Sequence, residues 1–162
     1  AKDRLKVATS SSGGDWVLID EVGRSGLLVN ASEDWDLAPF GSGYVYCFFK
    51  GYVYPGFKMH VGESTRMSNQ LWIEYNRGRV SLLSQQDEME PQVLDVQRVP
   101  NNGFSIKCAV FVSDQEVIFY WPGSTRRFNQ PGIRSDAPAR VRFHIPRNVV
   151  LEQLYIGNKK PR

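Results

Sequence analysis

One stretch of the sequence, Tyr120–Gln130, combines aromatic, arginine and amide side chains more densely than any other. Aromatic rings stack on the C–H surface of a sugar, planar amides bind its hydroxyls, and arginine binds carboxylates. The stretch reads as the end of a strand followed by a loop, and it predicts a glycan-binding site. The alternative is that its aromatic rings face a core and its arginines are merely solvated. The candidate residues are Phe119, Trp121, Arg126, Arg127, Asn129 and Gln130.

Side chains that transfer protons or attack as nucleophiles are scarce. The only histidines are His60 and His144, and no Gly-x-Ser-x-Gly elbow, phosphate loop or HExxH motif is present. Glu33, Asp34 and Asp36 are close enough in sequence for paired-carboxylate glycoside hydrolysis, but acidic residues are ordinary in such a turn. We therefore expect no catalytic residues and a chain that is not an enzyme.

Metal and cofactor sites are not indicated either. Asp87, Glu88 and Glu90 lack the spaced Asp, Asn and Gly residues of a calcium loop, and they are typical of a solvated loop. Cys47 and Cys108 match no metal-binding spacing, and each lies in an apolar stretch. We expect no cofactor, no metal and two buried free thiols, with a disulfide between them as the alternative.

The charge distribution is uneven. The formal net charge is +3, yet residues 123–162 hold nine Lys and Arg residues against two acidic ones. This asymmetry indicates either a basic face for an anionic partner or an ordinary solvated surface. Alternating arginine and aromatic residues also suit single-stranded nucleic acid, but the small net charge argues against that partner. The longest apolar runs are about five residues, far short of the roughly 20 of a membrane-spanning helix, so no membrane insertion is expected.

Short β-strands separated by turn signals dominate the chain between residues 15 and 145. Alternating and β-branched or aromatic segments of this kind predict an all-β antiparallel sandwich or barrel. The expected strands cover 16–20, 27–30, 43–50, 52–54, 57–61, 71–75, 80–84, 93–99, 104–112, 116–121 and 140–145.

The two ends of the chain differ from this pattern. Residues 1–14 end in Ser10–Gly14 and are expected to be a flexible lead-in to a domain over 15–158, and 159–162 form a basic tail. The chain begins at Ala1 rather than Met, and we interpret it as a piece of a longer protein.

The segment Asn148–Ile156 is expected to be a short helix. Asn148 is a capping residue type, and Gly157 is a typical C-terminal stop. Apolar residues recur between them at helical spacing. A final strand is the alternative, because Val149 and Val150 are β-branched. The apolar residues in question are Val150, Leu151, Leu154 and Tyr155.

Several segments, in order and spacing, resemble the head domain of the rotavirus outer-capsid spike protein. Asp15–Ile19 and Leu27–Trp35 resemble the opening of that domain, and Val117–Trp121 resembles its late hairpin. Phe143–Arg147 followed by Gln153–Asn158 resembles its last strand and C-terminal helix. The resemblance covers roughly half of the chain, and its departures from the family pattern indicate a divergent rotavirus group.

The resemblance implies a galectin-like two-sheet antiparallel β-sandwich with a short C-terminal helix. It implies a non-catalytic attachment domain on the virion surface, with host cell-surface glycans and the remainder of the viral spike protein as partners. The family's glycan pocket, between that helix and the neighbouring sheet, corresponds here to Arg147, Asn129, Gln130 and Phe119. Val150 replaces an acidic residue of the pocket, so one polar contact is missing.

Two other functions stay open. A cellular galectin-like or other β-sandwich protein-interaction module would have a similar strand order, although only His60 of the galectin His-x-Asn-x-Arg run is present in the segment His60–Ser64. A domain that binds polyanions or nucleic acid is the less favoured choice.

Overall fold

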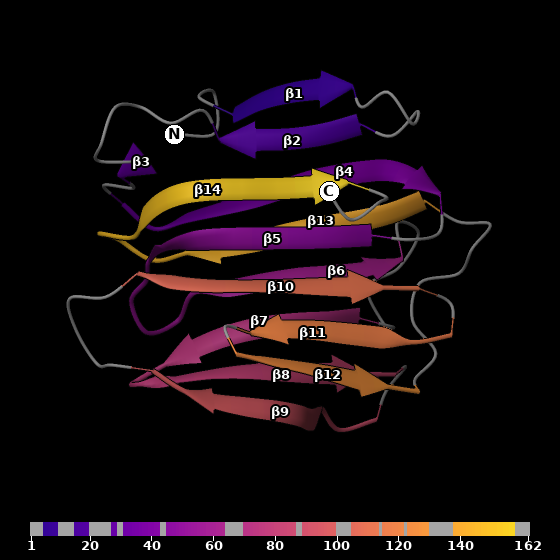
Figure 1. Ribbon diagram of the computed structural model, residues 1–162. Helices are drawn as coiled ribbons and strands as arrows, with labels where there is room; N and C mark the ends of the chain where they lie inside the picture. The colour runs from indigo at the N-terminus through magenta and orange to yellow at the C-terminus, as the bar shows by residue number, and fades with distance from the viewer. Residues whose placement is uncertain are drawn as a thin grey trace.

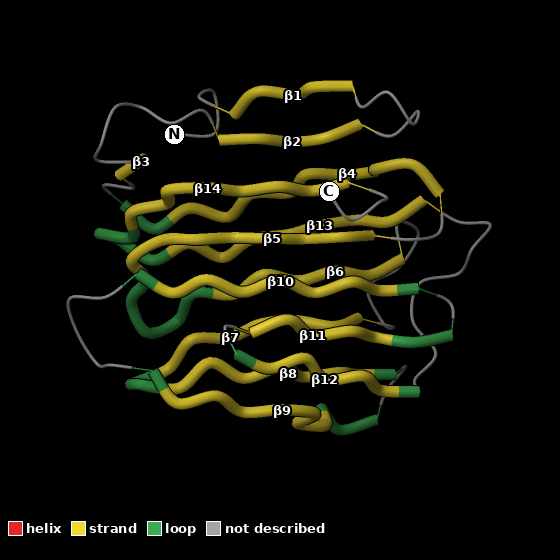
Figure 2. The backbone as a smooth tube through the Cα atoms, in the orientation of Figure 1, coloured by secondary structure: helices red, strands yellow, loops and turns green. Residues whose placement is uncertain are grey.

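The computed structural model shows an all-β protein with two antiparallel sheets packed face to face (Figure 1). It describes residues 5–9, 15–19, 27–28, 31–42, 45–63, 70–86, 89–99, 105–113, 115–121, 123–129 and 138–157. Figure 2 shows strands and loops but no helix in these ranges. The described part of the chain accordingly has no helix that is long and apolar enough to cross a membrane. The predicted galectin-like two-sheet sandwich is confirmed.

The larger sheet has eight strands. Its order is β1 (Leu5–Thr9), β2 (Asp15–Ile19), β14 (Val150–Gly157), β5 (Val45–Tyr52), β10 (Ile106–Val112), β11 (Val117–Trp121) and β12 (Ser124–Phe128), and β3 (Leu27–Leu28) also pairs with β14. The other sheet has six strands in the order β4 (Glu33–Ser42), β13 (Pro138–Ile145), β6 (Lys58–Glu63), β7 (Gln70–Asn76), β8 (Arg79–Gln85) and β9 (Gln92–Arg98).

Strand β5 shows how the sequence builds the core. Side chains alternate between the two faces of a strand, so Val45, Cys47 and Phe49 all point between the sheets and are fully buried. The ring centroids of Phe49 and Phe57 lie 4.9 Å apart. The ring centroids of Phe57 and Phe143, on the opposite sheet, lie 6.4 Å apart. Aromatic contacts therefore join the two sheets through the centre of the core.

The C-terminal segment is a strand, so the expected helix over Asn148–Ile156 is wrong. In β14, Leu154 pairs with Phe49 and Ile156 with Cys47, and both side chains are fully buried. A β-bulge between Leu151 and Gln153 shifts the register, so the buried positions are 151, 154 and 156. The bulge adds one residue to the strand, so three positions rather than two separate the buried residues Leu151 and Leu154. A spacing of three resembles helical periodicity in the sequence.

The sheet also begins earlier than the sequence suggests. Residues 5–9 form β1, which pairs with β2, although this range lies within the predicted lead-in over 1–14. The rest of the division into lead-in, domain and tail stays a prediction.

Cys47 and Cys108 are buried free thiols, as expected from their apolar surroundings. They lie on the neighbouring strands β5 and β10, where Cys47 pairs with Val110 and Cys108 with Phe49. Burial raises the pKa of both thiols, so they are protonated at neutral pH.

Gly51 allows β14 to lie against β5 at the bulge. A Cβ on Gly51 would overlap the carbonyl oxygen of Val150 and lie 3.1 Å from the Cα of Leu151. We expect Gly51→Ala to lower the free energy of unfolding by about 1–3 kcal/mol, the usual cost of overpacking. It should also weaken the protection of β14 amides against hydrogen exchange, because the new methyl group separates the two strands.

Gly123→Ala is the control for this variant. Gly123 has a φ of +85°, but a Cβ there would meet nothing within 4 Å. Alanine should therefore cost only the strain of a left-handed backbone, about 1–2 kcal/mol, and leave the exchange of β14 unchanged. Unaltered exchange protection of β14 in Gly51→Ala would contradict the close packing described here.

Candidate functional site

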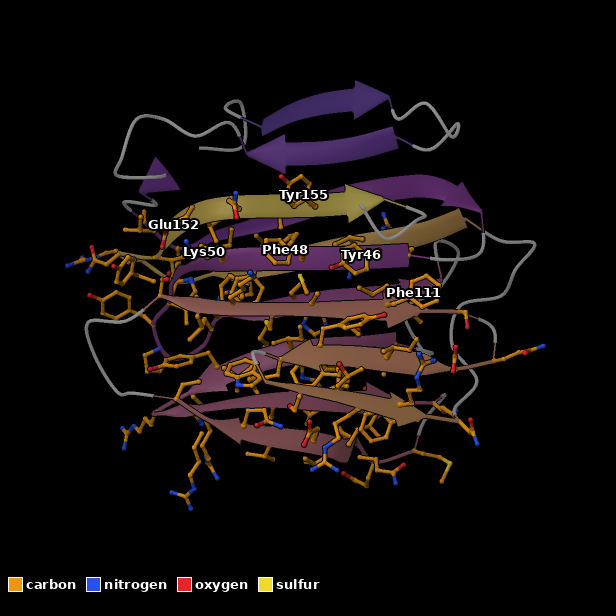
Figure 3. All side chains as sticks on the ribbon, in the orientation of Figure 1. Tyr46, Phe48, Lys50, Phe111, Glu152 and Tyr155 are labelled. Carbon is orange, nitrogen blue, oxygen red and sulfur yellow. The ribbon has the colours of Figure 1, made fainter. Side chains whose placement is uncertain are left out.

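The outer surface of the eight-stranded sheet is rich in aromatic side chains. Figure 3 shows Tyr46, Phe48, Phe111 and Tyr155 on this side of the sheet, and the register adds Tyr120 of β11, which pairs with Ala109. We call these five residues the aromatic face. An antiparallel sheet usually directs polar residues to solvent, so a cluster of rings on the outer side is a candidate binding surface.

Contacts between neighbouring side chains hold the rings of the aromatic face in place. Tyr46 and Tyr120 meet edge to face with centroids 6.1 Å apart, and Phe48 and Tyr155 lie 5.7 Å apart. The ammonium group of Lys107 lies 5.8 Å from the Phe48 ring centroid. Such pairs fix the ring positions before any ligand arrives, which reduces the ordering cost of binding.

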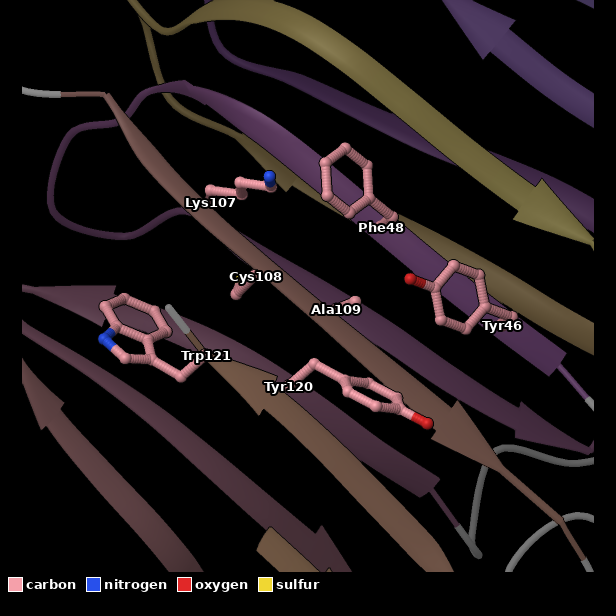
Figure 4. Close-up of a pocket in the computed structure, with 7 residues that line it drawn as sticks. All are labelled: Tyr46, Phe48, Lys107, Cys108, Ala109, Tyr120 and Trp121. Atoms are coloured by element: carbon pink, nitrogen blue, oxygen red, sulfur yellow. The ribbon is translucent and has the colours of Figure 1, made fainter. Parts of the chain in front are cut away.

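A pocket opens where strands β10 and β11 part. Their pairing ends at Ala109 and Tyr120, and the next residue, Trp121, pairs only with Ser124 of β12. The gap between the strands has a volume of about 280 Å³, near the lower limit for small-ligand sites (Figure 4). Its lining residues are Tyr46, Phe48, Lys107, Cys108, Ala109, Tyr120 and Trp121.

The pocket offers hydrogen-bond donors rather than bases. Burial, and to a lesser extent the neighbouring Tyr120, raises the pKa of Tyr46 to about 12. The Tyr46 hydroxyl and the Cys108 thiol are therefore both protonated at neutral pH. The Tyr46 hydroxyl, the Lys107 ammonium and the ring faces can together bind a ligand that has both apolar C–H surface and polar oxygens.

Only part of the site expected from the sequence lies at this pocket. Trp121 is half-buried and lines it. Phe119 is fully buried in the core, which is the alternative that the sequence left open. Arg126 and Arg127 are exposed and lie on the edge strand β12, where a loop was expected. Arg127 lies 3.5 Å from the Glu116 carboxylate.

Arg147 and Asn129 do not meet. Asn129 follows Phe128 at one end of the sheet, whereas Arg147 precedes β14 at the other end, where Val150 pairs with Tyr52. Four strand spacings, about 19 Å, also separate β14 from β12. The pocket expected between them is therefore not formed by these residues, and Gln130 lies outside the described residues.

Sequence reasoning missed the residues that do converge. Tyr46, Phe48, Lys107 and Tyr120 lie on three strands and share no local motif. One signal was present, because Val45–Phe49 is apolar at both the inward and the outward positions. A strand of this kind, if its outer side faces solvent, exposes aromatic surface.

Both histidines lie on the outer side of the six-stranded sheet, away from the pocket. His60 stacks on Trp72 with centroids 5.4 Å apart, and burial lowers its pKa. His144 Nδ1 lies 2.7 Å from the Asp34 carboxylate. Among the described residues, no three His, Cys, Asp or Glu side chains are grouped to hold a metal ion.

Comparison with known proteins identifies the fold but not a family. No family model and no curated protein match the chain. Among solved structures, alginate lyase A1-II' of polysaccharide lyase family 7 is 11% identical over 93% of this chain and 78% of its own, with a TM-score of 0.51. A glycosidic hydrolase is 12% identical over 98% of this chain and 97% of its own, with a TM-score of 0.53. Fructofuranosidase from Schwanniomyces occidentalis, complexed with fructose, is 10% identical over 96% of this chain and 40% of its own, with a TM-score of 0.61.

These matches correct the expectation that the chain is not an enzyme. The same fold spans most of an alginate lyase and of a glycosidic hydrolase, so the β-sandwich gives no ground for excluding catalysis. The motifs whose absence suggested a non-catalytic chain belong to other folds, and unrelated chemistries share one fold. The comparisons also give no support for a rotavirus origin, because no family model and no curated protein match the chain.

The raised pKa of Tyr46 predicts a loss of stability at alkaline pH. The folded state holds the Tyr46 proton more tightly than the unfolded state, where the pKa is about 10. This contribution to stability is fully present below pH 10 and is lost as the pH rises towards 12. The two buried thiols act in the same direction, beginning near pH 8.5.

Urea unfolding at pH 9.5 and 11.5 measures how much of the alkaline loss of unfolding free energy is due to Tyr46. Tyr46→Phe should show a smaller drop in unfolding free energy between these pH values than the wild type, because it cannot ionise. The exposed Tyr52→Phe is the control and should keep the full drop. Equal drops in Tyr46→Phe and the wild type would show that Tyr46 is not held in its neutral form.

Proposed function

We propose that this protein binds saccharides on the aromatic face, with the pocket beside β10 and β11 as the primary site. The observation that carries the proposal is the placement of Tyr46, Phe48 and Tyr120 on the solvent side of a sheet, around a preformed pocket. Rings in this position add nothing to the core between the sheets. The rings of Phe48 and Tyr120 are partly exposed and are suited to the C–H faces of sugar rings, whereas Tyr46 is only 6% exposed and borders them.

The polar groups of the pocket supply the second half of saccharide recognition. The hydroxyls of Tyr46 and Tyr120 both donate and accept hydrogen bonds, and the Lys107 ammonium donates up to three. A sugar ring has apolar faces and a rim of hydroxyls. It can therefore stack on a ring of the pocket while its hydroxyls meet these polar groups.

The fold neighbours support this proposal at the level of substrate class. The structures with TM-scores above 0.5 include an alginate lyase and a fructofuranosidase in complex with fructose, both of which act on saccharides. The aromatic face is where we expect the corresponding site in this chain.

We also propose a finer role, in which the bound saccharides are host cell-surface glycans and the chain is an attachment domain on a virion surface. The segments Phe143–Arg147 and Gln153–Asn158, which resemble the rotavirus spike head, support it. Purified protein should then bind cultured cells and lose that binding after enzymatic removal of their surface glycans. Undiminished binding to the stripped cells would contradict the attachment role.

Substitution within the aromatic face tests the site. Tyr120→Ala should weaken saccharide binding about tenfold, because it removes a stacking surface and a hydroxyl from the pocket. Affinity is measured by a glycan array followed by calorimetric titration of the best ligand. Tyr54→Ala is the control, since Tyr54 is exposed but belongs neither to the aromatic face nor to the pocket, and it should keep wild-type affinity.

A third variant separates this site from the one expected from the sequence. The aromatic pocket predicts unchanged affinity for Arg147→Ala, whereas a site at the turn before β14 predicts a loss of about ten- to a hundredfold. Wild-type affinity in Tyr120→Ala together with a loss in Arg147→Ala would overturn the proposed location. A steep loss of binding with salt and no preference among neutral sugars would instead indicate a polyanion-binding surface.

A further inference from the structure

We propose that the pocket prefers acidic saccharides and that Lys107, at its rim, binds their carboxylate or sulfate group. This inference rests on the proposed saccharide site and specifies the class of ligand that the site takes. It follows from the charges on the two strands that flank the pocket, β5 and β10.

Lys107 faces a like charge across the sheet. In the register of β10 with β5, Lys107 pairs directly with Lys50, and both side chains lie on the outer surface. Directly opposite side chains have Cβ atoms about 4.5–5.5 Å apart, and two like charges in such a pair destabilise a sheet. An anion bound between or beside these lysines would relieve the repulsion.

Only one of the two lysines has an anionic partner in the described part of the chain. The Lys50 ammonium lies 3.6 Å from the Glu152 carboxylate on β14. Lys107 has no ion pair with a described acidic residue, and it is exposed. Because β5 lies between β14 and β10, Glu152 is two strand spacings, about 10 Å, from the β10 backbone. One uncompensated positive charge therefore remains on the β10 side, next to the pocket.

The position of Lys107 suits a ligand anion. Its ammonium is held near the Phe48 ring, 5.8 Å from the centroid. Figure 4 shows Lys107 and Phe48 along one side of the pocket and Tyr120 and Trp121 along the other. A sugar that stacks against Tyr120 would direct a substituent across the pocket towards Lys107. Among the described residues that line the pocket, none carries a carboxylate that would repel an anionic group.

Three matched tetrasaccharides test this preference and distinguish the two sources of negative charge. They are an oligomer of galactose, its sulfated form and an oligomer of galacturonic acid, each titrated at 50 mM and 500 mM salt. The wild type should bind at least one acidic oligomer tenfold or more tightly than the neutral one. That preference should shrink at high salt, because exposed charges are screened.

Lys107→Gln should lose the preference, with a ten- to hundredfold weaker affinity for the acidic oligomer. Its affinity for the neutral oligomer should fall much less, because the glutamine amide still donates hydrogen bonds to sugar hydroxyls. Lys58→Gln is the matched control, because Lys58 is on the other sheet and lies 3.5 Å from the Glu74 carboxylate. It should keep the wild-type preference. Thermal melting of both variants checks that they fold.

Two results would overturn the inference. Equal wild-type affinity for the neutral and acidic oligomers, or an unchanged preference in Lys107→Gln, refutes the acidic preference but leaves the saccharide site standing. Failure of the wild type to bind any of the three oligomers refutes the acidic preference and also counts against the proposed function. Binding of only the sulfated or only the uronic oligomer supports the inference and identifies the anionic group.

Discussion

The alternation of side chains along β5 is the constraint on which both the core and the binding surface depend. Val45, Cys47 and Phe49 fill the space between the sheets, while Tyr46 and Phe48 stand on the outer side. A shift of one residue in register would exchange the two sets. The pairing of β5 with β14 and β10 therefore fixes the core and, at the same time, the rings available to a ligand.

Many of the strands could be predicted from sequence because alternation and turn residues are local signals. Strands β4 and β12 could not, because acidic residues at 33–36 and arginines at 126–127 are typical of a turn and a loop. The C-terminal strand could not, since the bulge between Leu151 and Gln153 depends on pairing with β5 and produces a helix-like spacing in the sequence. The site was harder still. Tyr46, Lys107 and Tyr120 lie far apart along the chain, and only strand order and register bring them to one pocket. Of the residues expected from the sequence, Trp121 lines this pocket, whereas Arg147 lies before β14 at the opposite end of the sheet from Asn129.

The chemistry of the pocket is narrower than the fold that carries it. Structures with this fold include a polysaccharide lyase and glycoside-cleaving enzymes, so the sandwich does not by itself distinguish binding from catalysis. The pocket does supply two hydroxyls, aromatic surface and one ammonium, and burial keeps the Tyr46 hydroxyl protonated. These groups together favour recognition of a polar, ring-shaped ligand with an anionic substituent.

The most direct test of a saccharide site on the aromatic face is an NMR titration of the wild-type protein with its tightest-binding saccharide. The titration records the chemical shifts of the backbone amides and of the tryptophan indole N–H groups. Shifts should concentrate at Tyr46, Phe48, Lys107 and Tyr120 and at the Trp121 indole, because these groups line the pocket. The amide signals of residues on the outer side of the six-stranded sheet, such as His60, should not shift. Shifts confined to that other sheet, or to the turn at Arg147, would contradict a saccharide site on the aromatic face.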